Sequence, residues 1–428
     1  MGKWLRPLLA WGAVAALLVL AWHLKHPLML WLRPWETPIL LITGMAGGAA
    51  GLAGRPAHRR LFGAALLAMA ACALYREIEF AAVRASVLAA GPEARAAGAH
   101  FVVGFRDFAE VEALAERGLI GGLYLTRRNL RNTTPAALAT AIAQLQARRR
   151  ELGLPPLIVA ADQEGGEVSH LSPWLTPMPP LASLVDAGPT EQLADRARAY
   201  GRAQGAELAA LGVNLNFGPV VDLRPAATFA GDRLTLIARR AIAADPATVA
   251  TVARGYAAGL EEAGVGATCK HFPGLGRVRA DTHFTRASLA QAPAELAPDW
   301  QPFRAAGPRA AVMVGHVTLA AVDPDRAASH SRPVIAGLLR GELGHAGLVV
   351  TDDLNMGAVY GRGIGRVAGE ALAAGADLVL VSYDPDQLYR ALYGAARALA
   401  RGNIAAADLA ASRQRLAAFF AARGSPTQ

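Results

Sequence analysis

The sequence predicts a (β/α)8 barrel preceded by a membrane-spanning helical region, and three observations support this prediction. Residues 1 to about 80 contain three apolar runs, whereas residues 101 to 382 contain eight short apolar runs separated by amphipathic helical patterns. Polar residues directly follow five of those eight short runs. Strands that alternate with helices over about 250 residues are typical of this barrel, which places functional groups at the carboxyl ends of its strands.

The first region, residues 1–80, is predicted to cross a membrane two to three times. Pro7–Leu24 and Thr37–Gly54 contain no Asp, Glu, Lys or Arg, and Leu61–Tyr75 is a shorter third run. A spanning helix needs about 20 apolar residues, with a lower limit of about 17. A cleaved signal peptide is the alternative for the first run, but no clear cleavage site follows it. Tryptophans, which favour the headgroup level, lie at the ends of the runs: Trp4, Trp22, Trp31 and Trp35.

Basic residues in the short loops predict the orientation of these spans. Five of them lie before the first run or between the second and third, against two between the first and second, namely Lys25 and Arg33. Basic loops stay in the cytoplasm, so three spans place the large domain in the periplasm or outside the cell, and two would leave it inside. The expected location is the inner membrane, multi-pass, with an external domain. The five residues are Lys3, Arg6, Arg55, Arg59 and Arg60.

A helical linker, residues 81–97, is expected to lead into a catalytic domain, residues 98–428. The alternative to a closed barrel is a doubly wound open sheet, which rarely needs this many repeats. Two amphipathic helices, Asp386–Arg401 and Ile404–Ala422, are expected to close the barrel. The predicted strands are Phe101–Phe105, Ile120–Leu125, Leu157–Ala161, Val213–Phe217, Val265–Cys269, Ala311–Gly315, Leu348–Thr351 and Leu378–Ser382.

Composition argues against two other classes of protein. The net charge of +9 is carried by scattered basic residues without flanking aromatics, so nucleic-acid binding is not expected. The two cysteines, Cys72 and Cys269, lie in different apolar segments and form no C-x-x-C pair. The sequence therefore predicts neither a zinc site nor a disulfide framework.

The loop after the fifth barrel strand contains the strongest motif. Lys270-His271-Phe-Pro-Gly-Leu-Gly is followed by Asp281 and His283, one residue apart. A carboxylate beside an imidazole orients the ring and raises its basicity for proton transfer. An incidental surface Asp and His are the alternative, but the Lys-His-Phe-Pro-Gly directly upstream favours a functional pair.

This stretch resembles the signature of family 3 glycoside hydrolases, in the β-N-acetylhexosaminidase branch: K-H-F-P-G-H-G, a few residues, then D-[ST]-H. The resemblance extends from about Gly98 onward. It implies an exo-acting, retaining enzyme that removes terminal β-linked N-acetylhexosamine, such as N-acetylglucosamine of peptidoglycan-type glycans. It implies no metal ion or organic cofactor. The expected partners are thus a carbohydrate substrate and, through the N-terminal helices, the membrane.

The resemblance also implies roles for residues at the strand ends. Asp352, directly after Leu348–Thr351, would be the nucleophile, with Asp353 as the alternative. His283 would be the acid/base, held by Asp281 on a mobile loop. Sugar-binding groups would be Asp162, Lys270, His271 and Arg240, with Arg233 as a weaker alternative to Arg240.

The chain departs from the family pattern at three positions. Glu167 and His170 replace two arginines of D-x-E-G-G-R-V-x-R, and Leu275 replaces the second histidine of K-H-F-P-G-H-G. Because the second of these arginines commonly contacts the sugar, His170 becomes a candidate binding residue that alters substrate preference. Glu167 and His170 leave open one alternative function, a catalytically silent, membrane-tethered glycan-binding protein. A second alternative keeps the chemistry but uses phosphate as the acceptor, which would make the protein a phosphorylase on the same fold.

Overall fold

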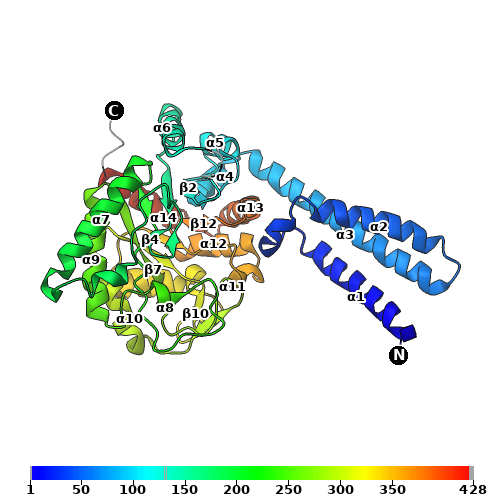
Figure 1. Ribbon diagram of the computed structural model, residues 1–428. Coiled ribbons are helices and arrows are strands. Elements are labelled where there is room, and N and C mark those ends of the chain that lie inside the picture. The colour runs from blue at the N-terminus through cyan, green and yellow to red at the C-terminus, as the bar shows by residue number, and fades with distance from the viewer. Residues whose placement is uncertain (1, 130, 132, 424–428) are drawn as a thin grey trace. The chain divides into compact units, whose positions relative to one another are not determined.

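The computed structural model describes residues 2–129, 131 and 133–423. The contacts divide the chain into two compact units between Ala89 and Ala90, and Figure 1 traces both. Side chains of residues 2–6, which include the predicted orientation signals Lys3 and Arg6 and the predicted interface residue Trp4, lie outside the described part.

Eight parallel strands form a closed sheet in the second unit (Figure 1). β1 pairs with β12, and a parallel bridge from Val350 to Leu378 joins β12 to β11, so the sheet closes on itself. The predicted barrel is confirmed, and the open doubly wound sheet is excluded. In chain order the strands are β1 (Phe101–Val103), β2 (Gly122–Leu125), β3 (Ile158–Ala161), β6 (Leu215–Asn216), β7 (Gly266–Phe272), β9 (Ala311–Val314), β11 (Val349–Thr351) and β12 (Val379–Val381).

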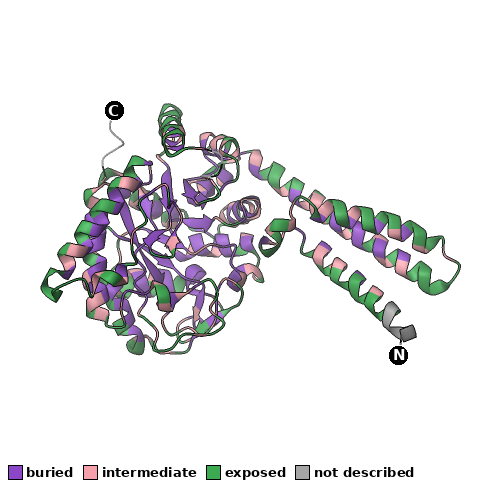
Figure 2. Cartoon of the chain, viewed as in Figure 1, coloured by how far each residue is buried: buried purple, intermediate pink, exposed green. Residues whose placement is uncertain are grey.

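A helix follows each barrel strand and covers its outer face. Figure 2 shows the strands buried and the outer faces of the helices exposed. Three of these helices begin where side-chain oxygens of Asp107, Thr134 and Asp245 accept hydrogen bonds from backbone N–H groups of the first turn. The helices are α5 (Phe108–Glu116), α6 (Pro135–Glu151), α7 (Leu193–Ala210), α9 (Pro246–Glu262), α10 (Pro293–Ala305), the π-helix η5 (Pro333–Glu342), α12 (Ile364–Ala374) and α13 (Gln387–Ala400).

Apolar side chains fill the barrel interior, and the C-terminal helix α14 (Ala406–Ala421) contributes to the same core. Phe419 of α14 approaches the start of β7 closely: a Cβ on Gly266 would lie 2.7 Å from its ring. Glycine at that position therefore lets α14 pack against the amino-terminal ends of the strands. α13 and α14 correspond to the two predicted closing helices, and α4 (Pro92–Gly98) precedes β1.

Short elements extend the loops at the carboxyl ends of the strands, where they position the site. β4 (Gln163–Gly165) and β5 (Val168–Ser169) form an antiparallel pair directly after β3. The others are η2 (Leu181–Leu184), η3 (Thr190–Gln192), α8 (Ile237–Arg240), β8 (Ala287–Leu289), β10 (Val317–Leu319), η4 (Ala328–His330) and α11 (Gly357–Tyr360).

The N-terminal unit contains α1 (Gly2–Trp22), η1 (Pro27–Leu32), α2 (Glu36–Leu52) and α3 (Ala57–Leu88). Glycines let α2 and α3 pack closely. A Cβ on Gly48 would lie 2.5 Å from Leu67 Cγ, and one on Gly51 would lie 2.6 Å from Gly63 Cα. A Cβ on Gly44, four positions before Gly48, would likewise lie 2.5 Å from Ala70 Cβ. Small residues at this spacing let membrane helices pack closely.

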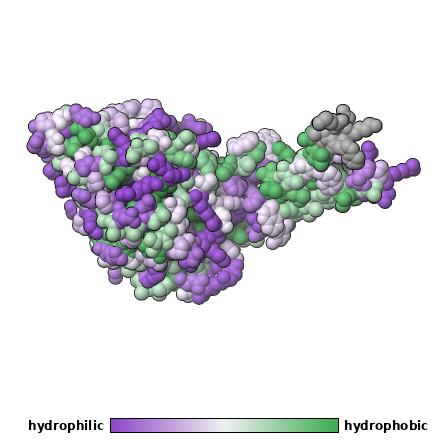
Figure 3. Space-filling model, turned by 90° about the horizontal axis from the view of Figure 1, so that it is seen from below, coloured by the Kyte–Doolittle hydropathy of each residue, from purple (hydrophilic) through white to green (hydrophobic). Residues whose placement is uncertain are grey.

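Within the described residues, α3 alone is long and apolar enough to cross a membrane, and Pro7–Trp22 is a shorter apolar helix. The two to three predicted spans therefore remain a prediction. α3 runs without interruption from Ala57 to Leu88, so the predicted linker 81–97 comprises the end of α3, a turn and α4. Large apolar side chains such as Leu8, Val19 and Ile42 are exposed on this unit, and apolar residues recur along its surface in Figure 3.

Candidate active site

Charged and polar side chains meet at the carboxyl ends of the barrel strands, as predicted. Asp162 follows β3, Asp222 lies beyond β6, and Asp352 follows β11. β7 is longer than predicted and includes Lys270 and His271 in its last residues. The strand ends therefore bring groups from distant parts of the sequence to one end of the barrel.

Lys270 lies at the centre of a buried charge cluster. Its Nζ donates to Asp162 Oδ1 and lies 2.6 Å from Glu164 Oε1. Arg240 donates to both oxygens of Glu164, through Nε at 3.0 Å and Nη2 at 2.7 Å. The side chain of Lys270 is 3% exposed and that of Asp162 is 17% exposed. Asp162 is therefore the more accessible of the two to a ligand.

The electrostatics of this cluster favour the charged form of each group. Burial by itself raises the pKa of Asp162, but the charges and hydrogen bonds of its neighbours, led by Lys270, together outweigh burial and lower the pKa to about 2. Burial likewise opposes ionisation of Lys270, but Asp162 and Glu164 raise its pKa above the ordinary value. The cluster therefore offers fixed charges, both donors and acceptors, for the hydroxyls of a sugar.

Tyr124 and His170 extend the cluster beyond Asp162. The Tyr124 hydroxyl donates to Asp162 Oδ2 and lies 3.1 Å from His170 Nδ1. The Tyr124 ring stacks on Phe217, with centroids 5.8 Å apart. Burial lowers the pKa of His170, which favours the neutral imidazole. His170 thus lies beside Asp162, within the predicted binding region.

Asp222 fixes the start of the loop that follows β7 and contains Asp281 and His283, called here the motif loop (residues 273–283). Its Oδ2 accepts from the His271 backbone N–H at 3.1 Å and lies 2.8 Å from His271 Nδ1, and its Oδ1 accepts from the Leu275 backbone N–H at 2.7 Å. The carboxylate therefore orients the His271 ring and fixes the turn that follows it. Leu275 contacts Asp222 only through its backbone N–H and not through its side chain.

Asp281 and His283 form a hydrogen-bonded pair, with His283 Nδ1 2.8 Å from Asp281 Oδ1. Asp281 is buried, whereas the His283 side chain is 33% exposed. Burial raises the pKa of Asp281, but backbone donors led by Leu234 and His283 outweigh burial and lower the pKa to about 2. The ionised carboxylate thus orients an imidazole that ligands can reach.

Asp352 and Asp353 have different surroundings. Burial raises the pKa of Asp352, but the nearby His271, His316 and His283 outweigh burial and lower it. Asp353 instead accepts hydrogen bonds at both carboxylate oxygens, from Asn355, Ser382 and Tyr383. The carboxylate of Asp353 therefore joins the loops after β11 and β12, whereas that of Asp352 lies among the imidazoles.

His316 is positioned by two hydrogen bonds: Nδ1 lies 2.7 Å from Ser329 Oγ, and Nε2 lies 2.9 Å from the carbonyl oxygen of Asp353. Both ring nitrogens are thus engaged by the protein. His316 therefore has a structural role between the loops at the mouth of the barrel.

Four residues that contact the site had no predicted role: Glu164, Tyr124, Asp222 and Thr235. Glu164 lies within the Asp162-Gln-Glu motif, so its sequence position could have indicated it. Tyr124 lies on β2 and resembles any buried strand aromatic. Arg233, the alternative to Arg240, contacts Asp281 through its backbone N–H at 3.0 Å, whereas Arg240 uses its side chain within the cluster.

The low carboxyl pKa values predict acid sensitivity. In the folded state the pKa of Asp162 is about 2, against an ordinary 3.8. The unfolded chain therefore binds more protons in acid, and the stability from Asp162 is complete above about pH 5 and decreases as the pH falls toward 2. The melting temperature should fall between about pH 5 and pH 3.

Asp162→Asn should weaken this dependence, because the variant cannot take up the proton. Asp186→Asn, at an exposed position, is the control and should melt like the wild type at each pH. An unchanged pH dependence in Asp162→Asn would contradict the assignment.

The arrangement can perform acid/base and nucleophilic chemistry at one centre. An ionised carboxylate such as Asp352 can attack an electrophilic carbon, and an oriented imidazole such as His283 can protonate a leaving oxygen. Among the residues that the structure describes, no group of three or more His, Cys, Asp or Glu side chains could hold a metal ion.

Comparison with known proteins identifies the family. The sequence profile of the glycosyl hydrolase family 3 N-terminal domain matches residues 95–419. The β-hexosaminidase of Xanthomonas campestris is 39% identical, over 65% of this chain and 80% of that protein. The β-N-acetylhexosaminidase structure from Beutenbergia cavernae is 32% identical, with a TM-score of 0.67, over 77% of this chain and 98% of that one.

A family 3 β-N-acetylglucosaminidase structure from a Paenibacillus species is 35% identical, with a TM-score of 0.69. The match covers 78% of this chain and 64% of that longer one. Fold, site and matches together define a glycoside hydrolase. The chain belongs to glycosyl hydrolase family 3.

Proposed function

We propose that this chain is a membrane-anchored, retaining exo-β-N-acetylglucosaminidase that acts on amino-sugar glycans such as peptidoglycan fragments. The observation that carries the proposal is the meeting of the loop that holds His283 with the loop that begins at Asp352: the His283 carbonyl oxygen accepts a hydrogen bond from the Gly357 backbone N–H at 2.8 Å. Asp352 is the nucleophile that forms a glycosyl-enzyme intermediate. His283, oriented by Asp281, protonates the leaving oxygen and then deprotonates water.

The Lys270 cluster binds the sugar in this proposal. Asp162 accepts hydrogen bonds from ring hydroxyls, while Lys270 and His271 donate. Arg240 acts through Glu164, whose two oxygens it binds. The Tyr124 hydroxyl contacts both Asp162 and His170 and so links the two side chains. Because His170 is a neutral ring, it recognises the sugar differently from an arginine.

The test of activity is nitrophenol release from nitrophenyl N-acetyl-β-glucosaminide by the full chain in detergent. The matched nitrophenyl β-glucoside should react much more slowly. Proton NMR of the first product should show the β-anomer, because two displacements retain configuration. Inertness toward every β-glycoside, with sugar binding intact, would favour a silent glycan-binding protein. Glycosyl phosphate formed on adding phosphate would indicate a phosphorylase.

The N-terminal unit is the proposed membrane anchor. Trp22, Trp31 and Trp35 are exposed at the end of the unit that contains η1. Arg76 of α3 lies over the Trp22 ring, 5.8 Å from its centroid, which places residue 76 at that same end. The part of α3 before Arg76 is about 19 residues, or about 28 Å long, close to the thickness of a bilayer core of about 30 Å.

A polar cluster closes this end of the unit. Lys25 Nζ and Thr37 Oγ1 both donate to Glu77 Oε1, at 2.9 and 2.7 Å. At the opposite end, Arg55 is exposed in the turn between α2 and α3, and Arg59 and Arg60 are exposed in the first turn of α3. Exposed basic residues in a short loop favour the cytoplasmic side. The proposed topology therefore has three spans, and the barrel lies on the external side.

Protease added to spheroplasts that express the full chain should degrade the barrel without lysis, since a long domain crosses the membrane regardless of its charge. A cytoplasmic marker protein in the same cells should stay intact, which controls for leakage. Protection of the barrel until the cells are lysed would instead indicate two spans and a cytoplasmic enzyme.

A further inference from the structure

Thr235 contacts two parts of the site that are distant in sequence. Its carbonyl oxygen accepts a hydrogen bond from Arg240 Nη1 at 2.6 Å. Its hydroxyl lies 2.9 Å from Asp281 Oδ1 and 3.3 Å from His283 Nδ1. The residue is 5% exposed, so water competes little for these contacts. Thr235 therefore joins the Lys270 cluster to the Asp281–His283 pair.

The donors and acceptors around Thr235 determine the tautomer of His283. With a pKa of about 2, Asp281 is ionised and only accepts hydrogen bonds, so the Thr235 hydroxyl donates to it. The remaining lone pairs of Thr235 Oγ1 and the Asp281 carboxylate both face His283 Nδ1. Nδ1 therefore carries the hydrogen, which leaves Nε2 to exchange a proton with a substrate.

Hydrogen bonds from backbone N–H groups to two carboxylates stabilise the loop that contains Thr235. Asp232 accepts hydrogen bonds from the backbone N–H groups of Leu236 at 2.7 Å and Ile237 at 3.3 Å. Leu236 has a φ of 48°, in the left-handed region, so these bonds hold a turn that few side chains favour. Asp281 also accepts from the backbone N–H groups of Arg233 and Leu234, at 3.0 and 2.8 Å.

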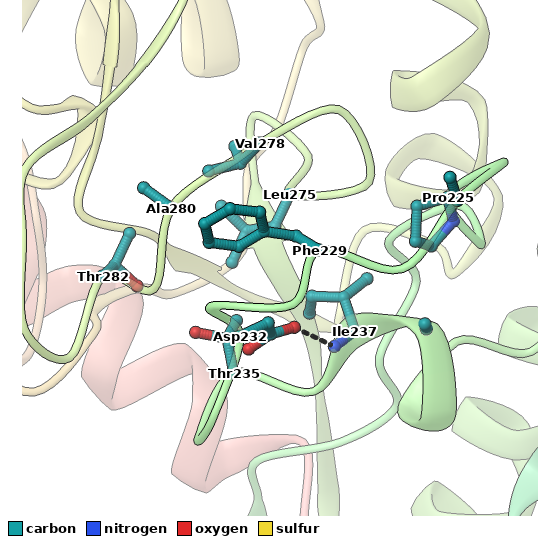
Figure 4. A pocket seen from close by; sticks show the side chains of 11 residues that line it. Pro225, Phe229, Asp232, Thr235, Ile237, Leu275, Val278, Ala280 and Thr282 are labelled. Carbon is teal, nitrogen blue, oxygen red and sulfur yellow. Dashed lines mark hydrogen bonds between the residues drawn. The ribbon is translucent and has the colours of Figure 1, made fainter.

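A small cavity separates this loop from the motif loop. Figure 4 shows Asp232 and Thr235 from one loop and Ala280 and Thr282 from the other around it. Its volume is about 20 Å³, enough for about one water molecule. Close packing is therefore incomplete here, and the hydrogen bonds to Asp281 connect the two loops.

We infer that Thr235 is a positioning residue that couples sugar binding at Arg240 and Glu164 to the orientation of His283. The inference rests on the proposed function, in which His283 is the acid/base, and extends it. When a sugar contacts the Lys270 cluster, Arg240 holds the Thr235 backbone, and the Thr235 hydroxyl holds Asp281 and His283 Nδ1. Loss of the hydroxyl thus impairs proton transfer while the binding groups remain.

Thr235→Val removes the hydroxyl but keeps the side-chain shape and the carbonyl. For nitrophenyl N-acetyl-β-glucosaminide, kcat should fall roughly tenfold, a fraction of the 10²–10⁴-fold effect of general acid–base catalysis, with KM little changed. For the dinitrophenyl substrate, whose leaving group needs no proton, cleavage of the glycosidic bond should be nearly unaffected. Single-turnover measurements isolate this step. Thr235→Ser should restore the wild-type ratio of the two rates.

Thr268→Val is the matched control, because Thr268 is a buried threonine whose hydroxyl has no partner among the described residues. It should leave both rates unchanged. An equal loss in Thr235→Val for both substrates, or a failure of serine to restore the ratio, would overturn the positioning role. If the wild type hydrolyses neither substrate, the proposed function fails first and the inference fails with it.

Arg240→Lys tests the coupling itself, and its effect in the wild-type background does not depend on whether Thr235→Val folds. In the wild-type background it should slow the nitrophenyl substrate more than the dinitrophenyl one. In the Thr235→Val background this difference should disappear, because the connection is already broken. Additive effects of the two changes would mean that Arg240 and His283 are independent.

Discussion

Asp352→Asn is expected to lower kcat by at least about a thousand-fold while sugar binding persists. The substitution keeps the size of the side chain but removes the negative charge that attacks the anomeric carbon. Burial opposes ionisation of Asp352, but the nearby His271, His316 and His283 favour the charged form that attacks. Pre-steady-state turnover and calorimetric titration with N-acetylglucosamine measure the two quantities separately.

Two further variants make this prediction specific. His283→Ala should also be severe, but its loss should not add to that of Asp352→Asn, because the nucleophile and acid/base act as a unit. Asp353→Asn should affect mainly stability, since its carboxylate accepts hydrogen bonds from Asn355, Ser382 and Tyr383. A mild Asp352→Asn beside a crippling Asp353→Asn would reverse the two assignments.

Lys270→Met is expected to lower the free energy of unfolding by about 3–5 kcal/mol, the usual cost of removing one partner from a buried ion pair. Lys270 contacts both Asp162 and Glu164 and is 3% exposed. Arg240 still compensates Glu164, so the penalty should fall mainly on Asp162. Thermal melting in detergent at neutral pH measures the effect.

The double variant Lys270→Met/Asp162→Asn should recover part of this loss, because it removes the uncompensated carboxylate along with the cation. Arg148→Met breaks an exposed pair with Glu151, at 3.0 Å, and should leave the melting temperature nearly unchanged. Equal effects of Lys270→Met and Arg148→Met would contradict the burial argument. Melting of the double variant below the single one would contradict the charge argument.

Much of the barrel could be predicted because its strands are local patterns. Runs such as Ala311–Gly315 are apolar, short and bounded by helical segments. The conformation of each run can therefore be predicted from its own residues, without knowledge of distant ones. Polar groups after these runs were expected to converge, because parallel strands bring their carboxyl ends to the same edge. Asp162, Lys270 and Asp352 were found by this reasoning.

Partners that lie far apart in the sequence could not be predicted. Glu164 and Arg240 are 76 positions apart, and nothing near either residue indicates the other. Tyr124 has the pattern of a core aromatic, and its hydroxyl contact with Asp162 exists because β2 and β3 are neighbours. Thr235 lies in a loop whose course is set by contacts with Asp281 rather than by local sequence.

The sequence by itself determined the class of fold, the Asp281–His283 pair and the family of this chain, because periodicity and motif spacing are properties of adjacent residues. Tertiary structure alone decided which carboxylate lies among the imidazoles. Asp352 and Asp353 are adjacent and chemically identical, but closure of the barrel brings His271 and His316 near the first, and Ser382 and Tyr383 against the second. It also placed Thr235 between the Lys270 cluster and His283, since that contact forms only when loops from separate strands meet.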